Sequence, residues 1–168
     1  MKALILTADG FEDAELTEPR RCLLDLGCEV DVAAPAHGRL AGKHGGRIEA
    51  TLALGEVDPR QYGLLLLPGG KAADTLSRDP RAQALARAFM QAGKVVAAIC
   101  HGPLILAAAG LLEGRRVTCY PRVAQVLRQA GASYQDAEVV VDGTLLTSRR
   151  PADLPAFMRE TAALLAKC

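Results

Sequence analysis

The sequence predicts one α/β domain in which helices cover both faces of a mostly parallel β-sheet. Short apolar runs without polar alternation, such as Leu64–Leu67, are typical of parallel strands buried on both faces. These runs alternate along the chain with segments whose apolar residues recur at helical spacing. Because 168 residues, 50% of them hydrophobic, suit a single core, residues 1–168 are assigned to one domain.

The first third of the chain contains two predicted strands, one helix and a small antiparallel excursion. Lys2–Thr7 is an apolar strand, and Asp13–Leu26 is a helix that ends at Gly27, a residue that favours helix termination. Glu29–Ala34 is the second strand. The glycine-rich segment His37–Leu54 alternates in short steps, which predicts an antiparallel ribbon outside the main sheet.

The remainder continues the alternation of strands and helices. Leu64–Leu67 is a fully apolar strand that ends at a Pro-Gly-Gly turn, and Asp79 and Pro80 have the N-cap and first-turn residue types of a helix through Met90. An Asp-Gly pair between apolar runs predicts a hairpin near the C-terminus. The other predicted elements are strands at Lys94–Ile99 and Arg116–Cys119, helices at Pro103–Ala109, Arg122–Ala130 and Ala152–Lys167, and hairpin strands at Glu138–Val141 and Leu145–Ser148.

Composition argues against several classes of partner. The net charge is +1 and no block of basic residues interrupts the sequence, so nucleic acid binding is not expected. The apolar N-terminus is too short for a signal peptide and no run is long enough to span a membrane, so we expect a cytoplasmic protein without membrane contact. Five cysteines, an odd number, predict reduced thiols rather than a disulfide framework.

The most informative stretch is VVAAICHGPLILAAAG, where a buried strand meets a helix. Ala98 and Gly102 flank Cys100 in the small-x-nucleophile-x-glycine pattern of a sharp turn that exposes a nucleophile at the carboxyl edge of a sheet. A thiol at the start of a helix is expected to have a lowered pKa. The alternative is that Cys100 is only a small buried apolar residue.

Several motifs in the same order resemble the PfpI family, within the superfamily that contains the parkinsonism-linked deglycase and the class I glutamine amidotransferase-like domains. They are FEDAEL (11–16), GKHG (42–45), LLLLPGG (64–70), CHGP (100–103), TCYP (118–121) and AEVVVDGTLLTSRRPADLPAF (137–157). The resemblance implies a flavodoxin-like sandwich and a homo-oligomer of two or more copies. We expect no cofactor. It also implies glyoxalase or deglycase chemistry on reactive dicarbonyls and their adducts, or intracellular cysteine peptidase activity, in stress protection.

The resemblance also implies roles for individual residues. The family nucleophile falls on Cys100, its neighbouring imidazole on His101 and its loop glutamate on Glu12. The backbone N–H groups of Gly70 and His101 fall where the family has its oxyanion hole. Tyr120 matches a position near the pocket, where it either hydrogen-bonds substrate or forms part of the wall.

The carboxyl group of Glu12 poses an electrostatic problem. A carboxylate beside a thiolate raises the pKa of both groups, whereas a protonated carboxyl donates a hydrogen bond to the sulfur and stabilises the thiolate. We therefore expect a neutral Glu12 against Cys100, acting as a proton carrier. The alternative is a solvated residue at a helix start, among the acids Asp9, Asp13 and Glu15.

His101 needs a second partner to fix its tautomer. In the PfpI family that partner is a glutamate from a neighbouring subunit, and the aligned residue here is Asp74, which is one methylene shorter. The alternative is that Asp74 caps a helix beginning near Thr75. Because consecutive side chains on such a turn diverge, we expect His101 and Cys100 to point apart.

The remaining candidates have weaker support. Cys22, Cys28 and Cys119 are expected in the core and Cys168 on the surface, with a resolving thiol as the alternative role of Cys119. Arg149 is expected to be structural or interfacial. His37 and His44 have no further His or Cys cluster at ligand spacing, so no metal site is expected.

Two classes of function remain open. One is an enzyme in which Cys100 attacks a carbonyl carbon, with a small dicarbonyl preferred over a peptide because its carbon is more electrophilic. The other is a redox sensor or chaperone-like protein in which Cys100 is oxidised to a sulfinate. The combination of Cys100, His101, Glu12 and Gly70 favours the enzyme.

Overall fold

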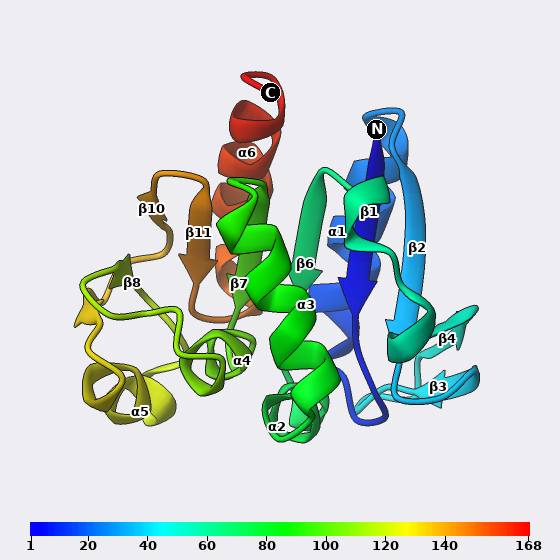
Figure 1. Ribbon diagram of the computed structural model, residues 1–168, viewed down its shortest axis with the longest axis horizontal. Helices are drawn as coiled ribbons and strands as arrows, with labels where there is room; N and C mark the ends of the chain where they lie inside the picture. The colour runs from blue at the N-terminus through cyan, green and yellow to red at the C-terminus, as the bar shows by residue number, and fades with distance from the viewer.

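The computed structural model describes all residues from 1 to 168 and contains a central sheet of seven strands (Figure 1). Every neighbouring pair in this sheet is parallel except β10 and β11, which form the predicted hairpin. The predicted fold class is therefore confirmed. In spatial order the strands are β10 (Val140–Asp142), β11 (Leu145–Ser148), β7 (Val95–Ile99), β6 (Leu64–Leu67), β1 (Lys2–Leu6), β2 (Glu29–Ala34) and β5 (Leu52–Ala53).

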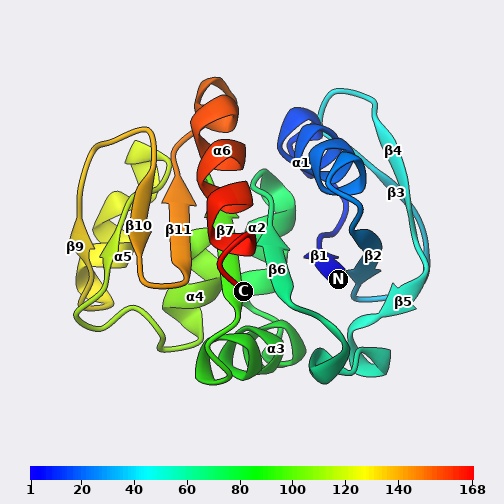
Figure 2. The ribbon, with the colours of Figure 1, turned by 90° about the horizontal axis from the view of Figure 1, so that it is seen from above.

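Helices cover both faces of the sheet, as Figure 2 shows from above. One face carries α1 (Asp13–Asp25) and α6 (Leu154–Leu165), and the other carries α2 (Lys71–Ser77), α3 (Pro80–Gln91) and α4 (Pro103–Ala108). The helix α5 (Ala124–Gln129) packs against α4. This three-layer arrangement explains why the central strands are apolar without alternation.

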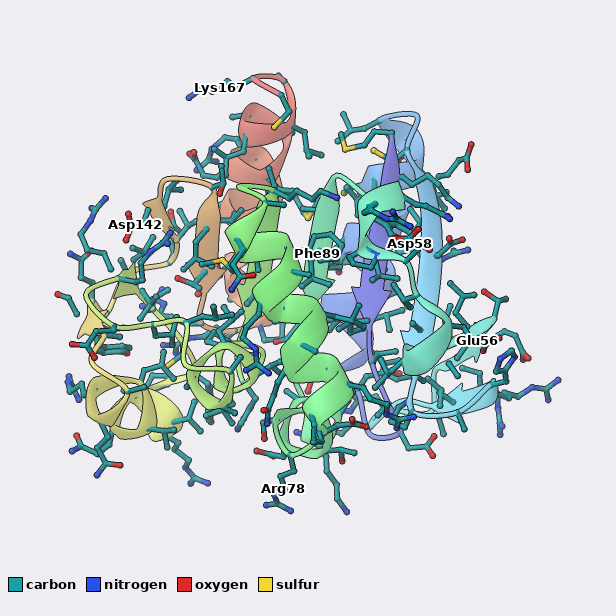
Figure 3. The ribbon with its side chains drawn as sticks, in the orientation of Figure 1. Glu56, Asp58, Arg78, Phe89, Asp142 and Lys167 are labelled. Atoms are coloured by element: carbon teal, nitrogen blue, oxygen red, sulfur yellow. The ribbon has the colours of Figure 1, made fainter.

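The core consists of two apolar clusters, one on each face of the sheet. Successive residues of a strand point to opposite faces, so Leu4 belongs to one cluster and Ile5 to the other. Phe89 of α3 is fully buried in the first cluster and Phe157 of α6 in the second. Figure 3 labels Phe89 and, toward the outside of the molecule, charged residues such as Lys167.

Two small sheets lie outside the central one. The predicted excursion is confirmed as an antiparallel ribbon of β3 (Gly38–Ala41) and β4 (Arg47–Ala50). The second small sheet pairs β8 (Arg116–Val117) with β9 (Ser133–Tyr134). The strand predicted at Arg116–Cys119 is therefore shorter than expected and does not join the central sheet.

The segment after β6 also differs from the prediction. The helix α2 begins at Lys71, directly after Gly70, whose φ of 80° turns the chain sharply out of the strand. Asp74 thus lies within α2, and the alternative that it caps a helix near Thr75 is wrong.

No helix of the structure has the length and apolar character that a membrane crossing requires.

The parallel order brings several strand ends to one edge of the sheet. In the register between β11 and β7, Ser148 lies opposite Ile99, and in that between β6 and β7, Leu67 lies opposite Ala98. The residues that follow these strands, including Cys100 and Gly69, therefore meet at the carboxyl edge, where ligands of open parallel sheets bind.

Gly102 is required where the chain passes close to β6. A Cβ atom at this position would overlap the carbonyl oxygen of Leu67 and approach the carbonyl oxygen of Ile99 to 2.9 Å. We predict that Gly102→Ala lowers the free energy of unfolding by about 1–3 kcal/mol, the usual cost of overpacking. Gly55→Ala is the matched control, because no atom lies within 4 Å of its Cβ position and its φ is not left-handed, so a change below about 0.5 kcal/mol is expected. Denaturant titration compares the two variants, and equal stabilities would contradict the prediction.

Candidate active site

Cys100 occupies the sharp turn between β7 and α4 that the sequence predicts. Its φ is +62°, and it is the only non-glycine residue with a positive φ. Two backbone hydrogen bonds hold the turn: the Cys100 N–H donates to the carbonyl oxygen of Ser148, and the Tyr120 N–H donates to that of Cys100, each at 3.0 Å. The turn directs the thiol into a cavity, and only 7% of the residue is exposed.

The cavity has a volume of about 400 Å³ and lies at the carboxyl edge of the sheet. Its walls come from the start of α1, the loop between β3 and β4, the ends of β6 and β7, and the segments that follow β8 and β11. Five of the predicted site residues line it, namely Glu12, Gly70, Cys100, His101 and Tyr120. The fold therefore gathers residues from six separate segments around one thiol.

His101 points toward the thiol rather than away from it. Its Nδ1 lies 3.2 Å from Sγ of Cys100, so the expectation that these consecutive side chains diverge is wrong. The left-handed backbone at Cys100 brings the two side chains to the same side, and the imidazole stacks on Tyr120 with ring centroids 5.1 Å apart. Burial lowers the pKa of His101, so at neutral pH the imidazole is largely neutral and its Nδ1 can accept the thiol proton.

The carboxyl group beside Cys100 belongs to Glu15, and the assignment of this position to Glu12 is corrected. Glu15 is completely buried, and its Oε1 accepts a hydrogen bond of 2.9 Å from the N–H of Gly69. Its Oε2 is buried without a conventional donor, and the carboxyl group interacts with the Cys100 side chain. Glu12 instead lies on the cavity wall, where it contacts His44 Nε2 at 2.9 Å and Lys43 Nζ at 3.7 Å.

The position of Glu15 follows from the pitch of α1. The buried residues of this helix are Glu15, Leu16, Pro19 and Leu23, which share one face at helical spacing. Glu12 is the residue before the first helical turn and lines the cavity. The apolar periodicity of the helix therefore contained the signal that identifies the inward carboxyl group.

The electrostatics of Cys100 and Glu15 are coupled. Burial raises the pKa of Glu15 to about 8, so this carboxyl is largely protonated at neutral pH. Burial also raises the pKa of Cys100, and a negative charge on Glu15 raises it further. The expected lowering of the thiol pKa at a helix start is thus wrong for the free protein, because removal from water outweighs the backbone donors.

Backbone donors face the sulfur from two directions. The N–H groups of His101 and Gly70 both act to lower the pKa of Cys100, which places them toward the thiol. Gly69 leaves room for this approach, since a Cβ there would lie 2.7 Å from the Cβ of Cys100. These are the two N–H groups that the sequence resemblance assigned to an oxyanion hole.

The loop between β3 and β4 is fastened to the start of α1 by Asp13. Its two carboxylate oxygens accept hydrogen bonds from the backbone N–H groups of His44 at 3.0 Å and Gly46 at 2.7 Å. The N–H of His44 is the main cause of the lowered pKa of Asp13. This contact places Lys43 and His44 on the cavity wall, a role that the sequence reasoning did not assign to them.

Asp74 lies next to the site but not in the same cavity. It lines an adjoining cavity of about 330 Å³ together with His101 and Gly70, and its negative charge acts to raise the pKa of His101. A contact from Asp74 to the His101 of a second subunit stays a prediction.

The other candidates lie away from the reacting groups. Cys28 and Cys119 are buried and Cys168 is exposed, as expected, whereas Cys22 is half-buried and packs against the core. Arg149 is structural: its Nε lies 3.0 Å from Asp153 and its Nη1 lies 3.1 Å from Asp136.

Comparison with known proteins agrees with the resemblance in the sequence. The chain is 47% identical over 165 residues to the deglycase TK1284 of Thermococcus kodakarensis, which covers 98% of this chain and 99% of that protein. It is 41% identical over 165 residues to the putative cysteine protease YraA of Bacillus subtilis, covering 98% of each. A ThiJ/PfpI domain protein from Brachyspira murdochii has a solved structure that superposes with a TM-score of 0.95 at 29% identity, covering 99% of this chain and 96% of that one. Residues 1–164 match the DJ-1/PfpI family, and the chain therefore belongs to that family.

Proposed function

We propose that this protein is a cysteine-dependent deglycase that acts on reactive dicarbonyls or on their adducts with proteins. The observation that carries the proposal is the thiol of Cys100, which lies 3.2 Å from the imidazole nitrogen of His101 and beside the protonated carboxyl of Glu15. Family relatives named deglycases, with 47% identity over nearly the whole chain, support the same activity.

The first bond-forming step uses three groups of the site. Sγ of Cys100 attacks the carbonyl carbon of the substrate, a C–S bond forms, and the electron pair of the C=O bond moves to oxygen. The thiol proton passes to Nδ1 of His101, which is largely neutral and within reach. The N–H groups of Gly70 and His101 stabilise the new oxyanion, a contribution typically worth a few kcal/mol.

Glu15 acts in this scheme as a neutral hydrogen-bond donor. A protonated carboxyl donates to the thiolate and adds no repulsion, whereas an ionised carboxyl opposes the negative charge that develops on sulfur and oxygen. Because burial raises the pKa of Glu15 to about 8, the protonated form of this carboxyl predominates at neutral pH. The role that the sequence reasoning gave to Glu12 is thus proposed for Glu15.

The shape of the cavity favours a small carbonyl compound over a polypeptide. Its volume of about 400 Å³ is enough for a dicarbonyl or a short adduct, and most of the residues that line it have polar or charged side chains. The relative named a putative cysteine protease keeps peptide hydrolysis as the alternative. Both reactions depend on the same thiol.

We predict that Cys100→Ala abolishes the consumption of methylglyoxal, because no other thiol lines the cavity. Methylglyoxal loss and peptide cleavage are measured on one preparation, with Cys119→Ala as the matched control for loss of a buried thiol. Full methylglyoxal activity in Cys100→Ala contradicts the proposal, and peptide cleavage without methylglyoxal loss in the wild type favours the peptidase.

The pH profile of kcat/KM tests the protonation states. We expect an acid limb on the acid side of the ordinary histidine pKa, because burial lowers the pKa of His101 and the protonated imidazole cannot accept the thiol proton. We expect an alkaline limb near pH 8, where Glu15 loses its proton and its charge opposes thiolate formation.

Glu15→Gln, which stays neutral at every pH, should remove the alkaline limb, whereas Glu12→Gln should keep it. If Glu15→Gln keeps an unchanged alkaline limb near pH 8, the proposed role of Glu15 is wrong.

A homo-oligomer remains part of the proposal, with Asp74 near His101. Removing the negative charge of Asp74 lowers the pKa of His101 further, so Asp74→Asn should move the acid limb to lower pH and reduce turnover. Light scattering on the same samples establishes whether assembly is unchanged. An acid limb at its wild-type position would show that Asp74 does not act on His101, and full activity in a dissociated monomer would show that the site needs no second subunit.

A further inference from the structure

Two arginines line the active-site cavity and have no acidic partner there. Arg122 and Arg150 line the cavity, and neither has a role in the proposed reaction of Cys100, His101, Glu15 and Gly70. The Nε of Arg150 is buried and has no hydrogen-bond partner. A buried, unpaired guanidinium nitrogen is costly to a folded protein, and a ligand that accepts its hydrogen bond removes this cost.

The backbone segments that carry the two arginines are both hydrogen-bonded to Cys100. Arg122 follows Tyr120 by two residues, and the Tyr120 N–H donates to the Cys100 carbonyl. Arg150 follows Ser148 by two residues, and the Ser148 carbonyl accepts from the Cys100 N–H. The two arginines therefore lie on segments that are hydrogen-bonded directly to the backbone of Cys100, and both line its cavity.

The acidic groups of the cavity contact residues other than the two arginines. Glu12 contacts His44 and Lys43, and Glu15 accepts the N–H of Gly69 and is largely protonated at neutral pH. The cavity thus contains one compensated pair and two uncompensated positive charges. Two cationic side chains without an acidic partner therefore line the cavity into which the Cys100 thiol points.

The neighbouring Arg149 shows the contrast along the same segment. Its guanidinium forms hydrogen bonds with Asp153 and Asp136, so its charge is neutralised and its geometry fixed. Arg150, one residue later, has no such pair and lines the cavity instead. Adjacent arginines therefore have distinct surroundings, and only the second is available to a ligand.

We propose that Arg122 and Arg150 form an anion-binding subsite beside Cys100, so that the preferred substrate is a carbonyl compound or adduct that carries a carboxylate or phosphate group. The inference rests on the proposed function for the identity of the reacting carbonyl. Guanidinium groups suit both anions, because their planar donors match the oxygens of carboxylate and phosphate.

Alkylation of Cys100 measures the subsite without any assumption about the reaction. Iodoacetate and iodoacetamide are similar in size, and only iodoacetate carries a negative charge. The measured quantity is the rate of Cys100 alkylation by iodoacetate divided by the rate with iodoacetamide, followed by mass spectrometry of the peptide that contains Cys100. This ratio cancels any effect of a variant on the thiol pKa. We expect Arg122→Gln and Arg150→Gln each to lower this ratio by about threefold to tenfold, with a larger loss in the double variant. High salt should reduce the ratio in the wild type.

Two controls accompany the measurement. Arg60→Gln removes the same charge from an exposed side chain ahead of β6, at the opposite edge of the sheet, next to the Asp58 labelled in Figure 3. Its ratio at Cys100 should equal that of the wild type. The exposed Cys168 gives an internal reference in every sample, and its ratio should not change.

The ratio at Cys100 decides the proposal. An unchanged ratio in Arg122→Gln, Arg150→Gln and the double variant overturns it, and so does an equal loss in Arg60→Gln. Protection of Cys100 from iodoacetamide by inorganic phosphate or by acetate, at constant ionic strength, then shows which anion the subsite prefers. Loss of the subsite is distinguishable from failure of the proposed function, because the first leaves methylglyoxal consumption dependent on Cys100 and the second does not.

Discussion

The active site depends on one backbone constraint, the left-handed conformation of Cys100. Its φ of +62° is maintained by two hydrogen bonds, one from Tyr120 and one to Ser148, which tie three segments together. The same turn brings Nδ1 of His101 to 3.2 Å from the sulfur, and the absence of a side chain at Gly69 permits its close approach to Cys100. The strained backbone at this residue is therefore supported by the end of β11 and by the segment after β8, and both segments contribute residues to the cavity wall.

Most of the fold could be predicted because local apolar patterns determine it. The strands β2 and β6 have the predicted boundaries, and the ribbon and the C-terminal hairpin were recognised from glycine spacing and an Asp-Gly turn. The pairing of β8 with β9 was not predictable, because Ser133–Tyr134 is short and has no apolar pattern. The start of α2 depends on the positive φ of Gly70, which residue type allows but does not impose.

The site was predictable as a set of segments but not as a set of contacts. The nucleophile, the glycine turn and the imidazole follow from motifs, and the structure places them in one cavity. The inward carboxyl was misassigned by three residues, since family resemblance was given more weight than the buried face of α1, on which Glu15 lies with Leu16. The raised pKa of Cys100 was missed because its cause is burial by distant segments, which local sequence does not reveal.

The buried carboxyl of Glu15 also affects the stability of the whole protein. Its pKa is 4.5 when exposed and about 8 in the folded state, so the folded chain holds a proton that the unfolded chain releases within this window. The contribution of Glu15 to the free energy of unfolding is therefore largest below pH 4.5. It is lost as pH rises toward 8, by at most about 1.4 kcal/mol per pH unit. Glu15 therefore acts on folding in the opposite direction to Asp13, whose lowered pKa gives a contribution that is lost as pH falls. The proton that keeps the carboxyl beside Cys100 neutral is thus also one that the folded state retains and the unfolded chain releases.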